Sequence, residues 1–281
     1  MNDRNAEPDA APERAPAAAD AARRRERHWA LIPALQIGFF VFVVVLWQVL
    51  VDAGLLDIFF FSRPSDIALR LGGWLISGSI YGHLAITLTE AMLAFVIGTV
   101  TGVIAGFALA RIDLLAAVFD PYIRILNALP RVILGPIFIL WFGLGIASKV
   151  ALGVTLVFFI VFFNTFQGVR EVDPVVLKNA RMLRASEAQL LRHVYIPSAL
   201  AWIFSSLHTS IGFALVGAVV GEYIGASQGI GYMVAQAQGT FDTTGVFAGL
   251  LLTSFVVLVI DMGINRVEAY LLRWRPQKEQ R

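Results

Sequence analysis

The chain of 281 residues contains no cysteine, which excludes a disulfide framework and any metal site built on thiolates. Charged residues are also scarce, at 15% of the sequence, whereas typical soluble domains carry about 25%. Hydrophobic residues make up 58% of the chain and the mean hydropathy is +0.73. This composition indicates an integral membrane protein built from helices, because a helix satisfies its own backbone hydrogen bonds in lipid.

Several motifs of soluble enzymes are missing as well. No G-x-x-x-x-G-K-[ST] phosphate loop occurs, which argues against ATP binding of that type, and no H-E-x-x-H or close His/Asp/Glu cluster predicts a metal site. Residues 225–229 do match G-x-S-x-G, but a nucleophile elbow needs a strand-to-helix turn on an α/β sheet. We prefer a flexible outer loop around Ser227, a possible gate, and we expect no catalytic residue, metal or cofactor on this chain.

Six apolar stretches are long enough to cross a bilayer, which takes about 20 residues. Proline interrupts the third of them at Pro130 and Pro136, where the lost backbone hydrogen bond predicts a kink. Residues 29–273 are therefore expected to form an all-α domain of six transmembrane helices between two polar tails, 1–28 and 274–281, of which the first is expected to be disordered. The predicted spans are 29–51, 84–110, 122–143, 147–169, 200–223 and 246–272.

The distribution of Lys and Arg predicts the orientation of these spans. Six basic residues precede the first span and five lie in 170–197, whereas the connection 224–245 has none. By the positive-inside rule, both termini and the segment 170–197 lie in the cytoplasm of a multi-pass inner-membrane protein. Topology also explains the basic pI of 9.1, so we expect lipid and no nucleic acid as a partner.

Four ionisable residues fall within or near the spans: Glu90, His208, Glu222 and Asp261. Charges in hydrocarbon are costly and often mark a substrate path, so His208, Glu222 and Asp261, together with Ser227, are candidate pathway or gate residues. The alternative, an interfacial position, is slightly favoured for Glu90 and Glu222. A neutral, hydrogen-bonded state is favoured for His208, and Asp261 is the hardest to explain without a function.

Glycines and an amphipathic stretch add two structural expectations. Gly98, Gly102 and Gly106 recur every four residues in the second span, a stripe that fits a pore helix or, as we prefer, close packing of two helices. Segment 52–83 breaks at Ser62 to Ser65 and then turns amphipathic, which predicts an interfacial helix outside the membrane.

The polar segment, residues 170–197, stands out between two long apolar runs. Asp173 followed by Pro174 predicts the start of a helix of about three turns. Ser186 and Gln189 have the spacing of a capping box, which opens a second helix. Pro197 is expected to end that helix, because the residue before a proline avoids the helical region. The alternative is a solvated loop whose charges serve topology alone.

The polar segment resembles the EAA loop of ABC-transporter permease subunits, with the pattern E-A-A, three residues, G, nine residues, I-x-L-P. Ala180 matches the second alanine and Pro197 the final proline, whereas Lys178 replaces the glutamate and Arg184 the glycine. Because arginine does not adopt the left-handed backbone as glycine does, the departure at Arg184 predicts a changed turn or a changed partner surface.

Other segments resemble the nitrate/sulfonate/taurine branch of binding-protein-dependent importers. They are residues 129–149, the Asn164-Thr165-x-x-Gly168 motif and residues 221–234, and the resemblance covers about 60–275. It implies a type I ABC importer permease fold, a second permease copy in a homodimer, a cytoplasmic ATPase dimer that binds ATP, and an extracytoplasmic solute-binding protein. The residues that it implies in ATPase coupling are Lys178, Ala180, Arg181, Leu183, Arg184, Ala185, Ser186 and Glu187.

The resemblance favours a permease subunit for a small solute such as nitrate, a sulfonate or taurine, with an aromatic acid or a pyrimidine as alternatives. An ion-coupled secondary transporter would instead show an internal repeat and intramembrane charge relays, and no convincing repeat is visible in the sequence. An intramembrane enzyme would need a catalytic constellation, and the sequence offers none.

Overall fold

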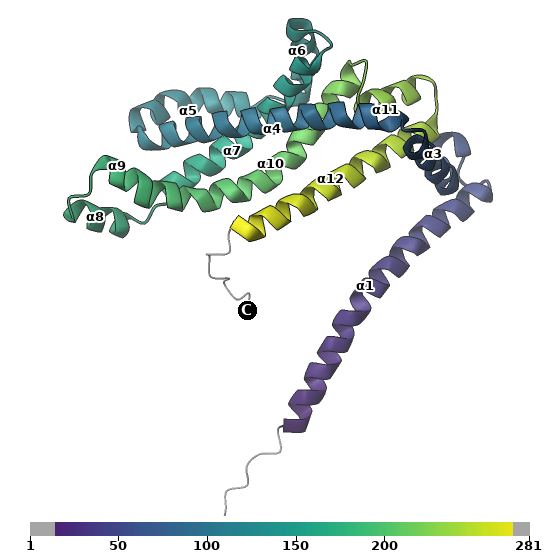
Figure 1. Cartoon of the computed structure of the whole chain (residues 1–281), viewed down its shortest axis with the longest axis horizontal. Helices are drawn as coiled ribbons and strands as arrows, with labels where there is room; N and C mark the ends of the chain where they lie inside the picture. The colour runs from purple at the N-terminus through teal and green to yellow at the C-terminus, as the bar shows by residue number, and fades with distance from the viewer. Residues whose placement is uncertain (1–14, 272–281) are drawn as a thin grey trace, which may run out of the picture. The chain divides into compact units, whose positions relative to one another are not determined.

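The computed structural model describes residues 15–271, and every regular element within that range is a helix. The chain divides into two compact units between Ser65 and Asp66. The helix labels are those of Figure 1.

The first unit contains the long helix α1 (Ala15–Asp52) and the short helix α2 (Ile58–Phe61). Residues 32–52 of α1 are long and apolar enough to span a membrane. The expected disordered tail overlaps this helix from Ala15 onward, where alanine, arginine and glutamate are strong helix formers. The remainder of that tail, residues 1–14, and the expected tail at 274–281 lie outside the described residues.

The remaining helices follow in chain order. They are α3 (Pro64–Ser77), α4 (Ser79–Arg111), α5 (Asp113–Ala128), η1 (Arg131–Ile133), α6 (Leu134–Phe142), α7 (Ile146–Arg170), α8 (Pro174–Met182), α9 (Glu187–Leu190), the π-helical turn η2 (Leu191–Tyr195), α10 (Ile196–Ile224), α11 (Ile230–Gly239) and α12 (Thr243–Leu271).

Five stretches of helix are long and apolar enough to cross a membrane, and a sixth crossing is made if the bent pair α5 and α6 counts as one span. The two parts of that pair, 113–128 and 131–142, meet at 79°. Pro130 lies in the break, where the sequence predicts a kink. The expected six-span architecture is confirmed, with a broken third span.

Three long helices form the core of the second unit. Helix α4 packs along α7, and α7 packs along α10 (Figure 1). Gly98, Gly102 and Gly106 lie on the contact with α7: a Cβ atom on Gly102 would come within 2.9 Å of the Phe158 carbonyl oxygen. The glycine stripe therefore serves close helix packing, as we expected, since small residues let two backbones approach in lipid.

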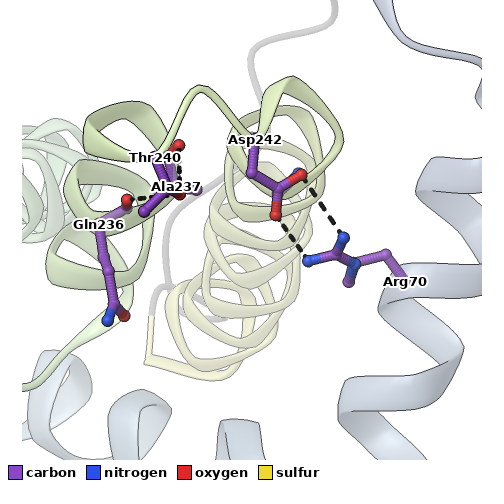
Figure 2. A network of polar contacts seen from close by, with 6 residues as sticks. Arg70, Gln236, Ala237, Thr240 and Asp242 are labelled. Carbon is purple, nitrogen blue, oxygen red and sulfur yellow. Dashed lines mark hydrogen bonds and ion pairs between the residues drawn. The ribbon is translucent and has the colours of Figure 1, made fainter.

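Helix α3 makes both an apolar contact and an ion pair with the rest of the second unit. Leu71 and Trp74 pack against the buried cluster that includes Ile80. Arg70 pairs with Asp242, between α11 and α12, with 2.7 Å from Nη1 to Oδ2 (Figure 2). The amphipathic helix expected in this region is confirmed, and its position outside the membrane stays a prediction.

The helix contact gives a first prediction, in which Gly106→Ala should destabilise the protein. Its Cβ would lie 2.7 Å from the Phe162 carbonyl oxygen, and overpacking of this kind costs about 1–3 kcal/mol. Gly82→Ala in the same helix is the matched control, because no atom lies within 4 Å of the position that its Cβ would take. Thermal unfolding in detergent measures both, and an unchanged melting temperature for Gly106→Ala would contradict the packing.

Candidate functional site

Two caps define the helices of the polar segment. The Asp173 carboxylate accepts a hydrogen bond of 2.7 Å from the Val175 N–H, and Pro174 occupies the first position of α8. At the start of α9, the Ser186 N–H donates to Gln189 Oε1 (2.8 Å) and the Gln189 N–H donates to Ser186 Oγ (3.3 Å). Both predicted helix starts are therefore confirmed.

The two short helices pack against each other around a small apolar core. Val172, Leu190 and Val194 are buried there, and Ala180 and Ala185 pack against them. At the turn between the helices, by contrast, large apolar side chains face solvent: Met182 and Leu183 are 82% and 84% exposed. The polar segment is thus a folded unit with an exposed apolar tip.

Arg184 occupies the left-handed region that we expected it to avoid, with φ +58°. The Arg184 N–H donates to the Arg181 carbonyl (2.9 Å) and the Ala185 N–H donates to the Ala180 carbonyl (3.1 Å). These are the two hydrogen bonds of a Schellman motif, whose left-handed position usually holds glycine. Of the two alternatives, a changed turn is wrong, because the turn is kept at a cost of about 1–2 kcal/mol for a residue with a Cβ atom. A changed partner surface stays a prediction.

Pro197 does not end the second helix, which corrects another expectation. The helical run continues from Glu187 to Ile224, and the π-helical turn from Leu191 to Tyr195 comes directly before the proline-containing start of α10. Proline at 197 has no N–H to donate to the His193 carbonyl, and its ring crowds that carbonyl. The wider π-helical turn relieves this crowding, so the helix continues through the proline.

Ion pairs connect the polar segment to the ends of the long helices. Arg111, the last residue of α4, pairs with Glu187 at 2.5 Å, and its guanidinium lies 4.3 Å from the centroid of the Tyr195 ring. Arg170, the last residue of α7, pairs with Asp113 at the start of α5 at 2.8 Å. The segment is therefore attached to α4 through side chains as well as to α7 and α10 through the backbone.

A second polar site lies inside the helix packing. Glu90 of α4, Lys149 of α7 and Glu222 of α10 are 2%, 1% and 1% exposed, and the lysine interacts electrostatically with both carboxylates. Glu222 accepts hydrogen bonds from the Thr87 hydroxyl (2.6 Å) and the Gly231 N–H (2.7 Å). We call Glu90, Lys149 and Glu222 the charge cluster.

The charge cluster also forms hydrogen bonds with two segments where one helix ends and the next begins. Lys149 Nζ donates to the carbonyls of Leu144 and Gly145, the latter at 3.2 Å, in the turn between α6 and α7. Thr87 accepts the Ile230 N–H at 2.9 Å, next to the Glu222 contact with Gly231, so both residues bind the start of α11. The cluster thereby joins three long helices to two turns.

Both carboxylates are buried between helices, and the membrane-interface depth expected for Glu90 and Glu222 stays a prediction. Sequence reasoning missed their partners, Lys149 and Thr87. One signal was present: two buried carboxylates require a cation, and Lys149 is a lysine at the start of an apolar stretch.

The other candidate pathway residues lie elsewhere. His208 of α10 and Asp261 of α12 form a pair, with 3.0 Å between Nε2 and Oδ1, so the interaction expected for His208 also accounts for Asp261. Ser227 is exposed in the loop between α10 and α11. Within the described residues, no hydrogen bond or ion pair joins Ser227 to the other three candidates.

Comparison with known proteins connects this architecture to a family. Residues 98–273 match the family described as "Binding-protein-dependent transport system inner membrane component". The putative aliphatic sulfonates transport permease protein SsuC of Bacillus subtilis (strain 168) is 34% identical over 241 residues, which cover 84% of this chain and 86% of that protein. The chain belongs to this family.

Two further proteins are similar to this chain over most of its length. The formylaminopyrimidine transport permease protein ThiX of Halalkalibacterium halodurans is 28% identical and covers 90% of this chain and 100% of its own length. A crystal structure of an amino acid ABC transporter with histidines superposes with a TM-score of 0.58 at 20% identity, over 72% of this chain and 97% of that one. The fold is that of type I ABC importer permeases, and the permease is a transport component whose ATP hydrolysis belongs to a separate subunit.

The charge cluster gives a prediction for the stability of the permease. Lys149→Met removes the hydrogen bonds from Nζ to the Leu144 and Gly145 carbonyls and the cation that interacts with both carboxylates, and it should cost about 1–3 kcal/mol. Lys178→Met, at an exposed position, is the control and should change stability little. Adding Glu90→Gln to Lys149→Met should recover part of the loss. Unfolding in detergent measures all three, and equal melting temperatures for the two lysine variants would contradict a stabilising cluster.

Proposed function

We propose that two copies of this permease form the pathway of an ATP-driven importer for a small organic anion of the sulfonate class. The polar segment contacts the ATPase in the cytoplasm, and a solute-binding protein delivers the substrate on the other side. The permease itself binds no cofactor, and ATP is held by the partner ATPase. The proposed contact residues are Lys178, Ala180, Arg181, Leu183, Arg184, Ala185, Ser186 and Glu187.

The observation that carries the proposal is the exposed apolar tip of the polar segment. Met182 and Leu183 are more than four-fifths exposed although the helices on either side of them are capped and packed. A water-facing turn that presents two large apolar side chains favours docking into a cleft of another protein. The preserved Schellman turn at Arg184 supports the same role, because it fixes the direction of the tip.

The charge distribution supports a cytoplasmic position for this tip. All five basic residues of the polar segment are exposed: Arg170, Lys178, Arg181, Arg184 and Arg192. Together with the basic residues before the first span, they favour the cytoplasmic side for the segment and for both termini. An ATPase of the cytoplasm can reach the tip only in that orientation.

The proposed mechanism is alternating access. ATP binding closes the ATPase dimer and displaces the polar segments of both permease copies. Because Arg111 and Arg170 connect each segment to α4 and α5, the displacement reaches the long helices and opens the pathway outward. Substrate passes from the binding protein into a mostly apolar pathway, so selectivity lies largely in the binding protein.

The substrate class rests on the relatives of the permease. The relative with 34% identity is named for aliphatic sulfonates, and a second relative is named for formylaminopyrimidine. A sulfonate is the proposal, and a pyrimidine is the alternative that the second relative favours.

Ala185→Asp tests the docking function of the polar segment. A carboxylate at the junction of α8 and α9 should abolish transport and substrate-stimulated ATPase activity, because it places a charge in a contact that buries apolar side chains. The transmembrane helices should remain folded, as judged by gel filtration and melting in detergent, because Ala185 borders only the small apolar core of the polar segment. Ala188→Asp is the matched control: the position is exposed in the first turn of α9, where a carboxylate is favourable. Normal substrate-stimulated ATPase activity in Ala185→Asp would refute the docking assignment.

A further inference from the structure

Arg131 lies at the break in the third span, at the first position of η1 between α5 and α6. Its guanidinium lies 4.7 Å from the centroid of the Phe159 ring. Phe159 is near the middle of α7, which runs from Ile146 to Arg170, about 20 Å along the helix from its start at 1.5 Å per residue. Arg131 is therefore at mid-depth of an apolar span.

The partners of Arg131 are neutral. Nη2 donates to the carbonyl and side-chain oxygens of Asn127, and Nε is buried with no hydrogen-bond partner. In the part of the chain that the structure describes, no carboxylate forms an ion pair with it. Arg124, on the same stretch of the chain, pairs with Asp120 at 2.9 Å. Arg131 thus keeps a positive charge that nothing described in this chain balances.

An unbalanced cation at this depth is costly, and such residues usually face a water-filled path for ions or charged solutes. A broken span is also where transporters commonly bind their substrates. Guanidinium recognises planar or tetrahedral oxyanions through several donors held in a fixed geometry. The missing counter-charge is therefore of the kind that a sulfonate supplies.

A cavity of about 410 Å³ lies between α5 and α7, on the side of Phe159 toward Arg170. Its lining begins one helical turn from Phe159, at Phe162 and Phe163, and includes Asn164 and Gln167. The charge of Asp120, which also borders this cavity, is compensated by Arg124. An anion that leaves Arg131 toward this end of α7 would meet aromatic rings and amides.

We propose that Arg131 binds the anionic group of the substrate at mid-membrane and selects sulfonates and similar oxyanions during passage. This proposal rests on the proposed importer function and deepens it, because it locates an anion contact in the permease. The competing explanation is structural: Arg131 caps the end of α5 through the Asn127 carbonyl and takes no part in transport.

The absence of native cysteine allows a direct test. The permease is reconstituted in liposomes with its ATPase and binding protein, and ATP-driven uptake of a labelled alkanesulfonate is measured. Arg131→Cys should lower uptake by about tenfold or more, the loss expected for one charge-assisted hydrogen bond. Arg266→Cys, at an exposed arginine of α12, is the matched control and should transport within about twofold of the parent.

Modification of the thiol introduced by Arg131→Cys then separates charge from structure. A methanethiosulfonate reagent that adds an ethylammonium group to this thiol should restore uptake, and the ethylsulfonate reagent should not.

Normal uptake by unmodified Arg131→Cys, restoration by both reagents, or no restoration together with an inactive Arg131→Lys would each overturn the anion contact. An active Arg131→Lys supports it even where the adduct fails. If the parent permease shows no ATP-driven sulfonate uptake, the proposed function itself fails, which is a separate outcome.

Discussion

The burial of Glu90, Lys149 and Glu222 in one cluster is the constraint around which the long helices are arranged. Between lipid-facing helices the hydrophobic effect gives little driving force, so association depends on close packing and polar contacts. Here the glycines of α4 supply the close packing against α7, and the charge cluster supplies the polar contact of α4, α7 and α10. Its hydrogen bonds to the α6–α7 turn and to the start of α11 fix the two irregular segments beside them.

The same helices carry the polar segment at their other ends. Arg111 connects the end of α4 to Glu187, while α7 and α10 lead directly into the segment. The long helices are thus joined by buried contacts at the charge cluster and by a few exposed ion pairs at the polar segment. This difference suits the proposed mechanism. In that mechanism the ATPase displaces the segment, and the long helices transmit the movement as stiff rods toward the break at Arg131.

Local signals in the sequence predicted most of the local structure. The cap at Asp173, the capping box at Ser186 and the break near Pro130 each depend on a few neighbouring residues, and all three are confirmed. The contacts that the sequence did not predict are between residues far apart in the chain. Lys149 approaches the two glutamates only when α4, α7 and α10 pack together, and His208 contacts Asp261 only when α10 and α12 lie side by side. The prediction for the backbone of Arg184 was wrong for a different reason. The Schellman hydrogen bonds and the packing of α8 on α9 hold this residue in the left-handed conformation that an arginine disfavours by itself.

The source of energy for uptake tests the central claim most directly. The permease, its ATPase and its binding protein are reconstituted in liposomes, and uptake of a labelled alkanesulfonate is followed with ATP present or absent and with ion gradients kept or collapsed by ionophores. The account predicts uptake that requires ATP and continues after the gradients are collapsed. Uptake that proceeds without ATP and stops when an ion gradient is removed would contradict it.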